Sequence, residues 1–445
     1  MTASALPARS APSAAPRRTL LIGLGLLLAM YLNALLPTGL SWDYDTPSDM
    51  LEGSLALKLQ WSPLFLIAVL MVWRSGWASW RHHLRLNPFL WLILLLAAAS
   101  MAWSPLPGVT LKKVVQLVGL YALCITITSV ARPTPLQWVR LALLCFLGIM
   151  AASVVMVIVN PALGTESVAG LAGAWRGVLD QKNSLGMVAA LALMFGVIHR
   201  CSTPTPVWQQ VAAGSLILLC LVMARSSTAM TVAALGSASY LLLRRDHLRS
   251  PQWLQRVLVV GLVLVLLILQ GFFIVHSRMP AWVELIEPVA NLFGKNADLT
   301  GRSDIWAYMW PVIGEHWVLG SGYGAFWLGP GSPSQVILDE FYWTPYQAHN
   351  GYIDVLNELG AVGLLTLLVA IGLQIRNMLR LGRTDRNTAA VHSALLIIVL
   401  FANITESSLF RGLNFMHIFH LMSCFLVNQQ CWLADQAAAQ ARGRP

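Results

Sequence analysis

Charged residues are scarce in this sequence. They make up 11% of its 445 residues, while hydrophobic residues make up 57%, and soluble proteins carry about 25% charged residues. This scarcity excludes an ordinary soluble domain and predicts a membrane protein in contact with membrane lipids. The net charge is +10, but the basic residues separate apolar stretches instead of forming one patch. We therefore expect no nucleic acid as a partner.

Cysteine is also rare, with six residues in or beside apolar stretches. No two of them have the spacing of metal ligands, so we expect neither a disulfide nor a zinc site. Acidic residues are missing from the middle of the apolar stretches, where a transporter would place an ion or proton relay. A transporter remains an alternative, although the sequence has no internal repeat that would predict two matching halves.

Long apolar runs are abundant. Twelve of them approach the roughly 20 residues that a membrane-spanning helix needs. They cover residues 19–38, 55–74, 88–104, 110–131, 136–159, 184–199, 207–224, 228–243, 254–276, 349–373, 388–404 and 413–433. We therefore expect an all-α polytopic membrane protein with about 12 transmembrane helices.

The apolar runs divide the chain into five parts. Residues 1–18 are expected to form a disordered cytoplasmic tail, 19–276 transmembrane helices 1–9, 277–348 a long periplasmic loop, 349–433 transmembrane helices 10–12, and 434–445 a second cytoplasmic tail. The long loop, between helices 9 and 10, is expected to be partly helical. Apolar residues at helical spacing in 281–293 predict an amphipathic helix on the membrane surface, and a second helix is expected near 303–310.

The orientation follows from the distribution of charge. With both termini inside, the inner segments hold 19 of the 29 Lys and Arg residues and three of the 19 acidic residues. This agrees with the excess of basic residues in cytoplasmic loops of membrane proteins. The long loop is then external. Lys112 and Lys113, at the outer start of a helix, are expected to contact lipid headgroups.

Five basic residues run against this bias because they fall in outer loops or at outer helix ends. They are Arg176, Lys182, Arg225, Arg302 and Arg411. Arginine suits phosphate because its planar guanidinium group donates two parallel hydrogen bonds. Several of these residues around one cavity at the headgroup level would suit a diphosphate. The alternative is that each contacts a headgroup or pairs with an acidic side chain such as Asp180, Asp304 or Glu406.

A histidine marks the point where the long loop meets the tenth span. His349 follows an aromatic, Gly-rich segment and lies on the same predicted side as the five basic residues. Neutral imidazole is a suitable general base near pH 7. A lone histidine at a helix end is more often structural, so the case for His349 depends on its position beside the basic loops.

Two spacings in these stretches resemble a known family. His349-Asn350, nine residues, Gly360, two residues and Gly363 is similar to the H-[NSQ]-x9-G-x-x-G signature of bacterial O-antigen ligases and of their relatives, the O-antigen polymerases. Arg225, ten residues and Gly236 resembles the R-x10-G motif of the ligases. Together with the predicted topology, the resemblance covers nearly the whole chain.

The resemblance implies an enzyme of lipopolysaccharide biosynthesis in the bacterial inner membrane, with its active site facing the periplasm. Such a glycosyltransferase moves a glycan from undecaprenyl diphosphate to a sugar hydroxyl of lipid A–core oligosaccharide, without a metal or other cofactor and with inversion. His349 would be the general base. Four residues would bind the diphosphate, namely Arg176, Lys182, Arg225 and Arg302. Asn350, Gly351 and Arg411 would support the site.

Two other readings stay open. An O-antigen polymerase on the same scaffold would use a lipid-diphosphate glycan as acceptor too. The Asp43-Tyr44-Asp45 sequence in the first outer loop is a D-x-D, which in a metal-dependent glycosyltransferase would bind the metal. A solvated turn is the simpler explanation of Asp43 and Asp45.

Overall fold

The computed structural model describes residues 17–37, 54–167, 171–244, 302–341 and 345–443. The expected ninth span, the expected amphipathic helix at 281–293, and Asp43 and Asp45 lie outside these ranges. Apart from one isolated antiparallel bridge between Thr165 and Trp175, every regular element in the described ranges is a helix. The predicted all-α class is confirmed to that extent.

The helices have these bounds in chain order. They are α1 Arg17–Leu35, α3 Leu55–Ser75, η2 Trp77–Ser79, α4 Arg81–Leu86, α5 Pro88–Ala99, η3 Ser100–Ala102, α6 Pro107–Ile125, η4 Thr126–Ala131, α7 Pro135–Val159, α8 Pro161–Gly164, α9 Lys182–Ser202, α10 Val207–Met223, α11 Ser227–Leu243, α14 Arg302–Glu315, α15 Gln335–Leu338, α16 Gly351–Leu381, α17 Arg386–Ala402 and α18 Phe415–Arg442.

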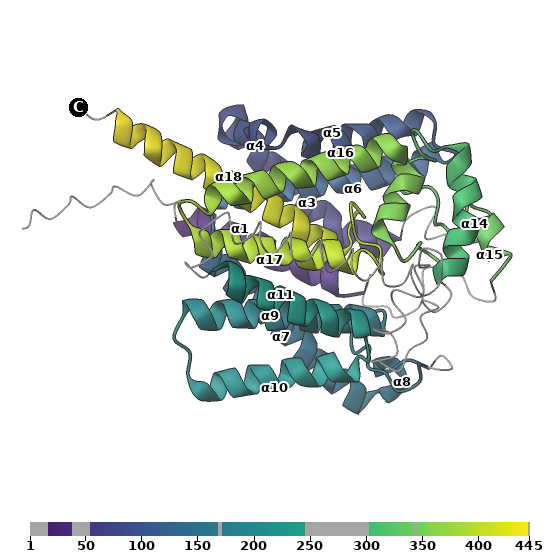
Figure 1. The fold of residues 1–445 in the computed structure, drawn as a ribbon, viewed down its shortest axis with the longest axis horizontal. Coiled ribbons are helices and arrows are strands. Elements are labelled where there is room, and N and C mark those ends of the chain that lie inside the picture. Colours follow the sequence, from purple (N-terminus) through teal and green to yellow (C-terminus); the bar gives the residue numbers. More distant parts are fainter. Residues whose placement is uncertain (1–16, 38–53, 168–170, 245–301, 342–344, 444–445) are drawn as a thin grey trace, which may run out of the picture.

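The long helices run side by side in one bundle (Figure 1). The first half of α18 is buried from Met416 to Gln429 with few interruptions, whereas α3 buries only Trp61 and Ala68. An apolar helix that is mostly exposed in the isolated chain is suited to contact with lipid, so α3 belongs to the periphery and α18 to the centre. The short helices α8, α14 and α15 gather at one end of the bundle, and α18 projects from the other end (Figure 1).

Six of the described helices are long and apolar enough to cross a membrane. They are Arg17–Leu35, Leu55–Ser75, Pro107–Ala131, Pro135–Val159, Lys182–Ser202 and Gly351–Leu381. Shorter apolar helices cover Pro88–Ala102, Val207–Met223, Ser227–Leu243 and Arg386–Ala402. These findings support a polytopic membrane protein, while the number of twelve spans and the long loop remain predictions.

Two helix boundaries differ from those expected. Helix α16 begins at Gly351 and runs to Leu381, so His349 lies in the chain just before the helix rather than in its first turn. Helix α18 continues to Arg442, beyond the expected end of the last span at 433. The Ala- and Gln-rich residues 434–441 are strong helix formers, which accounts for the extension.

Helix α16 is broken at Gly360, where the backbone has φ +65° and ψ −171°. A break leaves backbone N–H and C=O groups without partners inside the helix. Segment 317–322 supplies the partners through four hydrogen bonds: Ala361 N–H to Trp317 O (2.7 Å), Val362 N–H to Val318 O (3.1 Å), Ser321 N–H to Asn357 O (2.9 Å) and Gly322 N–H to Glu358 O (3.0 Å). The break therefore anchors the loop that follows α14 onto α16.

Only glycine fits at this break. A Cβ atom at Gly360 would overlap the carbonyl group of Val318, and the positive φ is unfavourable for other residues. We expect Gly360→Ala to lower the free energy of unfolding by about 2 kcal/mol or more. The measurement is thermal unfolding in detergent, monitored by size-exclusion chromatography of heated samples. Gly360→Ala should have a lower unfolding midpoint than the unaltered protein.

Gly372→Ala is the matched control, because Gly372 lies in the same helix and a Cβ atom there meets no other atom within 4 Å. Its unfolding midpoint should equal or slightly exceed that of the unaltered protein. Equal midpoints for the two variants would contradict the role given to Gly360.

Candidate active site

His349 lies in a tight connection at the start of α16. Its backbone has φ +50°, a conformation that is uncommon for a residue with a side chain. The next residue, Asn350, caps α16: its side-chain oxygen accepts hydrogen bonds from the N–H groups of Tyr352 and Ile353 at 3.0 and 3.2 Å. The cap fixes where the helix begins, and His349 lies in the strained backbone just before it.

The imidazole of His349 faces two polar side chains through the same nitrogen. Its Nδ1 lies 3.2 Å from Nε2 of Gln347 and 3.6 Å from Oε2 of Glu406. The side chain of His349 is 17% exposed, so it is largely enclosed but still reachable from outside. A carboxylate near Nδ1 favours the tautomer with its proton on Nδ1, which leaves Nε2 as the nitrogen that can accept a proton.

Glu406 connects three parts of the chain. Its Oε1 accepts hydrogen bonds from Asn183 Nδ2 at 2.9 Å and from Arg302 Nη2 at 3.1 Å, while Oε2 faces His349. Burial lowers the pKa of the Arg302 guanidinium group below its ordinary value, and the nearby Glu406 carboxylate opposes that shift. Arginine is the most basic of the side chains, so it stays charged here. Glu406 therefore holds α9, α14 and the His349 connection together.

The close approach of α16 to Glu406 requires a glycine. The backbone N–H of Gly351 donates to the carbonyl oxygens of Asn403 and Glu406 at 3.0 and 3.1 Å. A Cβ atom at Gly351 would overlap the side chain of Asn403. Gly351 and Asn350 therefore support the connection through the backbone and the helix cap. In this arrangement they position His349 rather than face a ligand.

The turn that carries Arg225 reaches the same place. Arg225, between α10 and α11, has φ +48°, and its carbonyl oxygen accepts a hydrogen bond from Lys182 Nζ at 3.3 Å. Three residues later, the hydroxyl of Thr228 lies 3.1 Å from that of Thr405, the neighbour of Glu406. The Arg225 turn and the His349 connection thus meet at residues 405 and 406, although they are far apart in the sequence.

Arg176 lies in the loop between α8 and α9, close to the same turn. Trp175 N–H donates to Met223 O at 2.9 Å, which joins this loop to the end of α10. The guanidinium group of Arg176 donates to Leu163 O at 2.8 Å, and that of Arg225 donates to Ala172 O at 3.2 Å. Backbone carbonyls thus hold both cationic side chains.

Arg411 is placed differently from the other four basic residues. It forms an ion pair with Asp354 at 3.1 Å and donates to Tyr346 O at 2.6 Å and to Gln347 Oε1 at 3.4 Å. The expected support of the site by Arg411 therefore takes a specific form. Arg411 fixes the chain leading to His349 and does not lie in the group around the Arg225 turn.

Sequence reasoning missed Asp354 and Gln347 and treated Glu406 only as a possible ion-pair partner. Asp354 accepts hydrogen bonds from Trp327 Nε1 at 2.8 Å and from Ala348 N at 3.1 Å, as well as the ion pair with Arg411. One signal was available: Glu406 and Asp354 are acidic residues at the ends of apolar spans, where a charge needs a partner. The identity of the partners depends on contacts across the fold and leaves no local pattern.

The structure offers no support for a metal site in the part of the chain that it describes, where no three His, Cys, Asp or Glu residues gather. Asp43 and Asp45 lie outside that part. A D-x-D metal site is therefore untested.

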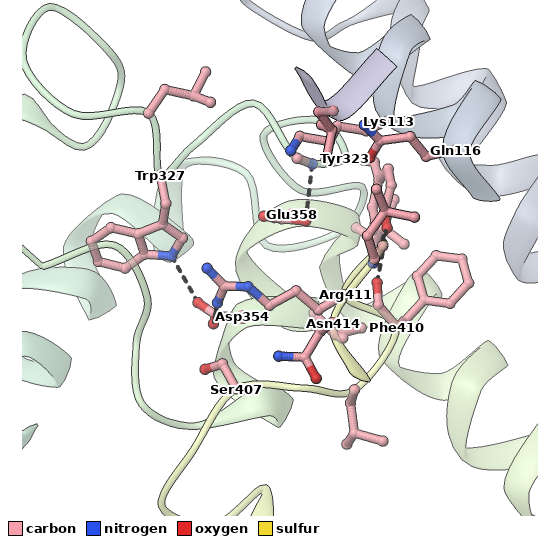
Figure 2. Close-up of a pocket in the computed structure, with 18 residues that line it drawn as sticks. Lys113, Gln116, Tyr323, Trp327, Asp354, Glu358, Ser407, Phe410, Arg411 and Asn414 are labelled. Carbon is pink, nitrogen blue, oxygen red and sulfur yellow. Dashed lines mark hydrogen bonds and ion pairs between the residues drawn. The ribbon is translucent and has the colours of Figure 1, made fainter. Parts of the chain in front are cut away.

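A cavity of about 310 Å³ lies beside the His349 connection, and its lining residues Asp354 and Ser407 accept hydrogen bonds from that connection. Figure 2 shows its polar side chains, among them Lys113, Asp354, Glu358 and Arg411. Lys113 was expected at the headgroups with Lys112, but it lines this cavity instead. The difference arises because α6 begins beside the loop that follows α14: the Cβ position of Gly324 lies against the Lys113 side chain.

Comparisons with known proteins point in one direction. The model of a family described as O-antigen ligase matches residues 212–368, a stretch that contains Arg225, Arg302 and His349. The chain is also 24% identical over 293 residues to the exopolysaccharide production protein ExoQ of Rhizobium meliloti (strain 1021). That alignment covers 64% of this chain and 63% of the relative, which is less than two thirds of the relative's length.

The contact between the Arg225 turn and the residues beside Glu406 can be tested by cross-linking. The hydroxyl oxygens of Thr228 and Thr405 are 3.1 Å apart, so cysteines at both positions should form a disulfide under mild oxidation. Cys201 is exposed and should first be replaced by Ser. Mass spectrometry of the linked peptides measures the yield.

The matched control places one cysteine a turn further along α11, at Thr231, where the hydroxyl instead donates to Ser227 O. The Thr231→Cys, Thr405→Cys pair should give little cross-link. Equal yields from the two pairs, or none from the first, would contradict the placement of the Arg225 turn beside Glu406.

Proposed function

The chain belongs to the O-antigen ligase superfamily of polysaccharide assembly, and from this premise we propose that it is a membrane glycosyltransferase that acts as an O-antigen ligase. It transfers a glycan from undecaprenyl diphosphate to a sugar hydroxyl of lipid A–core oligosaccharide. The observation that carries the proposal is the convergence of His349 and the Arg225 turn on Glu406 and Thr405. A base and a group of cations are then at one site, as this reaction needs.

In the proposed reaction His349 takes the proton of the acceptor hydroxyl through Nε2. The acceptor oxygen attacks the anomeric carbon of the donor, the bond from that carbon to the diphosphate oxygen breaks, and undecaprenyl diphosphate leaves with the bonding electrons. Attack opposite to the leaving group inverts the anomeric configuration. The imidazolium that results is stabilised by Glu406, 3.6 Å from Nδ1.

Gln347 competes with Glu406 for the same nitrogen. An amide N–H at 3.2 Å favours the tautomer in which Nδ1 has no proton, whereas the carboxylate favours a proton on Nδ1. A hydrogen bond to a charged acceptor is about twice as strong as a neutral one. A small movement of Glu406 toward His349 on substrate binding would therefore select the tautomer whose Nε2 can accept a proton.

Arg176, Lys182, Arg225 and Arg302 would bind the diphosphate. Their charge balances the negative charge that develops on the leaving group, the task that a divalent cation performs in many other glycosyltransferases. Backbone carbonyls already hold the guanidinium groups of Arg176 and Arg225, so little reorganisation is needed during the reaction.

The proposed location is the bacterial inner membrane, with the site facing the periplasm. In Figure 1, α4, which carries Arg81 and Arg85, lies at the opposite end of the bundle from α14, which carries Arg302. The excess of basic residues on cytoplasmic segments assigns the α4 end to the cytoplasm. The donor and acceptor would both reach the site from the outer leaflet.

A polymerase on the same scaffold is the second candidate, and one observation favours it. The relative ExoQ is named for exopolysaccharide production, and polymerisation would use a lipid-diphosphate glycan both as donor and as acceptor. The identity of the acceptor separates the two functions.

We expect purified protein in detergent to transfer glycan from undecaprenyl diphosphate to lipid A–core in the presence of EDTA. His349→Ala and Arg225→Ala should each lower the rate by about 100-fold or more, because each removes a base or an electrostatic donor. Gel electrophoresis of the glycosylated lipid measures transfer.

His316→Ala and Arg200→Ala are the matched controls. His316 is an exposed histidine of the same loop region, and Arg200 contacts Gln210 at the other end of α9. Both should transfer at nearly the normal rate. Transfer that persists in His349→Ala would remove it as the base, and loss of transfer with EDTA would turn attention to Asp43 and Asp45. Chain extension on the lipid diphosphate without transfer to core would identify a polymerase.

Glu406→Gln tests the role of the carboxylate beside His349. The amide can still accept from Asn183 and Arg302, but it no longer stabilises the imidazolium. We expect transfer to slow by about 10-fold or more. The loss should appear in kcat rather than in the KM for either substrate, because the carboxylate faces His349 through Oε2.

A purely structural role for Glu406 predicts a different result. The rate would then fall in proportion to the amount of folded protein, and the rate per folded molecule would be unchanged. The kcat of folded, monodisperse Glu406→Gln protein therefore separates positioning from folding.

A further inference from the structure

The cavity beside the His349 connection is formed by five parts of the chain, one of which is Leu57 at the start of α3. Helix α6 contributes Lys113 and Gln116, the loop after α14 contributes Tyr323 and Trp327, and the first turns of α16 contribute Asp354 and Glu358. The connection between α17 and α18 completes it with residues 407 and 409–414. Its volume of about 310 Å³ is at the lower end of the range for small-ligand sites. It is therefore large enough for one sugar unit.

The charges around this cavity are balanced. Two carboxyl groups, Asp354 and Glu358, face two basic groups, Lys113 and Arg411 (Figure 2). The group around the Arg225 turn, in contrast, is dominated by cations and suits a diphosphate. A balanced set of hydrogen-bond donors and acceptors suits a neutral ligand that is rich in hydroxyl groups, because each hydroxyl both donates and accepts.

Some polar groups of the lining have no partner in the described part of the chain. The side-chain amide of Gln116 and the amide nitrogen of Asn414 make no hydrogen bond there, although Asn414 Oδ1 caps α18 by accepting from Met416 N at 2.9 Å. The rings of Trp327 and Phe410 add apolar surface. Sugar rings bind to this combination of polar groups and aromatic carbon.

The cavity is joined directly to the chain that carries His349. Asp354 accepts a hydrogen bond from Ala348 N at 3.1 Å, Ser407 Oγ accepts one from Asn350 N at 3.1 Å, and Arg411 donates to Tyr346 O at 2.6 Å. All three are lining residues of the cavity. A ligand in the cavity would therefore contact the groups that position His349.

We propose that this cavity binds a sugar unit of the glycan acceptor, so that the acceptor and the donor diphosphate occupy separate places beside the His349 connection. The acceptor hydroxyls donate to Glu358 and accept from Gln116 and Lys113. Binding there keeps Asp354, Ser407 and Arg411 in place, and the next sugar of the acceptor presents its hydroxyl to His349. This inference rests on the proposed glycan transfer.

Steady-state kinetics with each substrate varied in turn provide the test. Gln116→Leu removes hydrogen-bonding capacity from a side chain that has no hydrogen-bond partner among the described residues. Glu358→Gln removes a charge while its oxygen can still accept from Gly324 N. Each should raise the KM for lipid A–core by about 10-fold and leave the KM for the undecaprenyl diphosphate donor unchanged. Glu315→Gln, at the exposed end of α14, should change neither.

A binding measurement without turnover accompanies the kinetics. Core oligosaccharide freed of its lipid by mild acid should bind the His349→Ala protein, as detected by saturation-transfer NMR, and the signal should be lost when Glu358→Gln is added. Unchanged acceptor KM values in both cavity variants would overturn the inference while the proposed function stands. A raised donor KM would also overturn it, because the cavity would then belong to the donor.

Failure of the proposed function would be seen separately. If the unaltered protein transfers glycan to no acceptor, the proposed reaction is wrong, and this inference fails with it before any variant is compared.

Discussion

The site depends on the Glu406 carboxylate, a negative charge at the end of an apolar bundle that cannot remain unpaired. A buried charge is tolerated when other groups donate to it. Glu406 meets this requirement with Asn183 from α9, Arg302 from α14 and His349 from the connection before α16. Pairing one carboxylate thus brings a histidine and an arginine from separate parts of the chain to one place. The chemistry of the site and the packing of its helices therefore depend on the same contact.

Glycine makes this convergence possible because backbone must approach backbone at two points of α16. At Gly351 the helix start lies against the turn at 403–406, and at Gly360 the helix opens to exchange hydrogen bonds with segment 317–322. Gly360 is one of the two glycines of the spacing that contains His349, and Gly351 is one of its nine unspecified residues. The spacing therefore includes a geometric requirement, because only glycine fits at the break in α16.

The sequence predicted the helices well because apolar length is a local property. Eleven of the twelve expected spans overlap described helices, and the remaining one lies outside the described ranges. The sequence also predicted one site for His349, Arg225 and Arg302, because it predicted one side of the membrane for all three. In the structure His349 and Arg302 both contact Glu406, and the Arg225 turn lies beside Thr405. The sequence could not place Arg411 beside Asp354 or Lys113 in a cavity. Those contacts join residues that are 57 or more positions apart, and no local spacing encodes them.

The position of Arg411 has a further physical consequence. An arginine directed at the diphosphate would add a positive charge to a region that already has several. Paired with Asp354 instead, Arg411 adds no net charge to the cavity side, and it fixes Tyr346 and Gln347 in front of His349. The cavity and the group of cations around the Arg225 turn can then differ in electrostatic character, although both lie beside His349. A charged diphosphate and a neutral glycan would each find the place whose charge suits it, which is how a single histidine could serve two different lipid-linked substrates without mixing their sites.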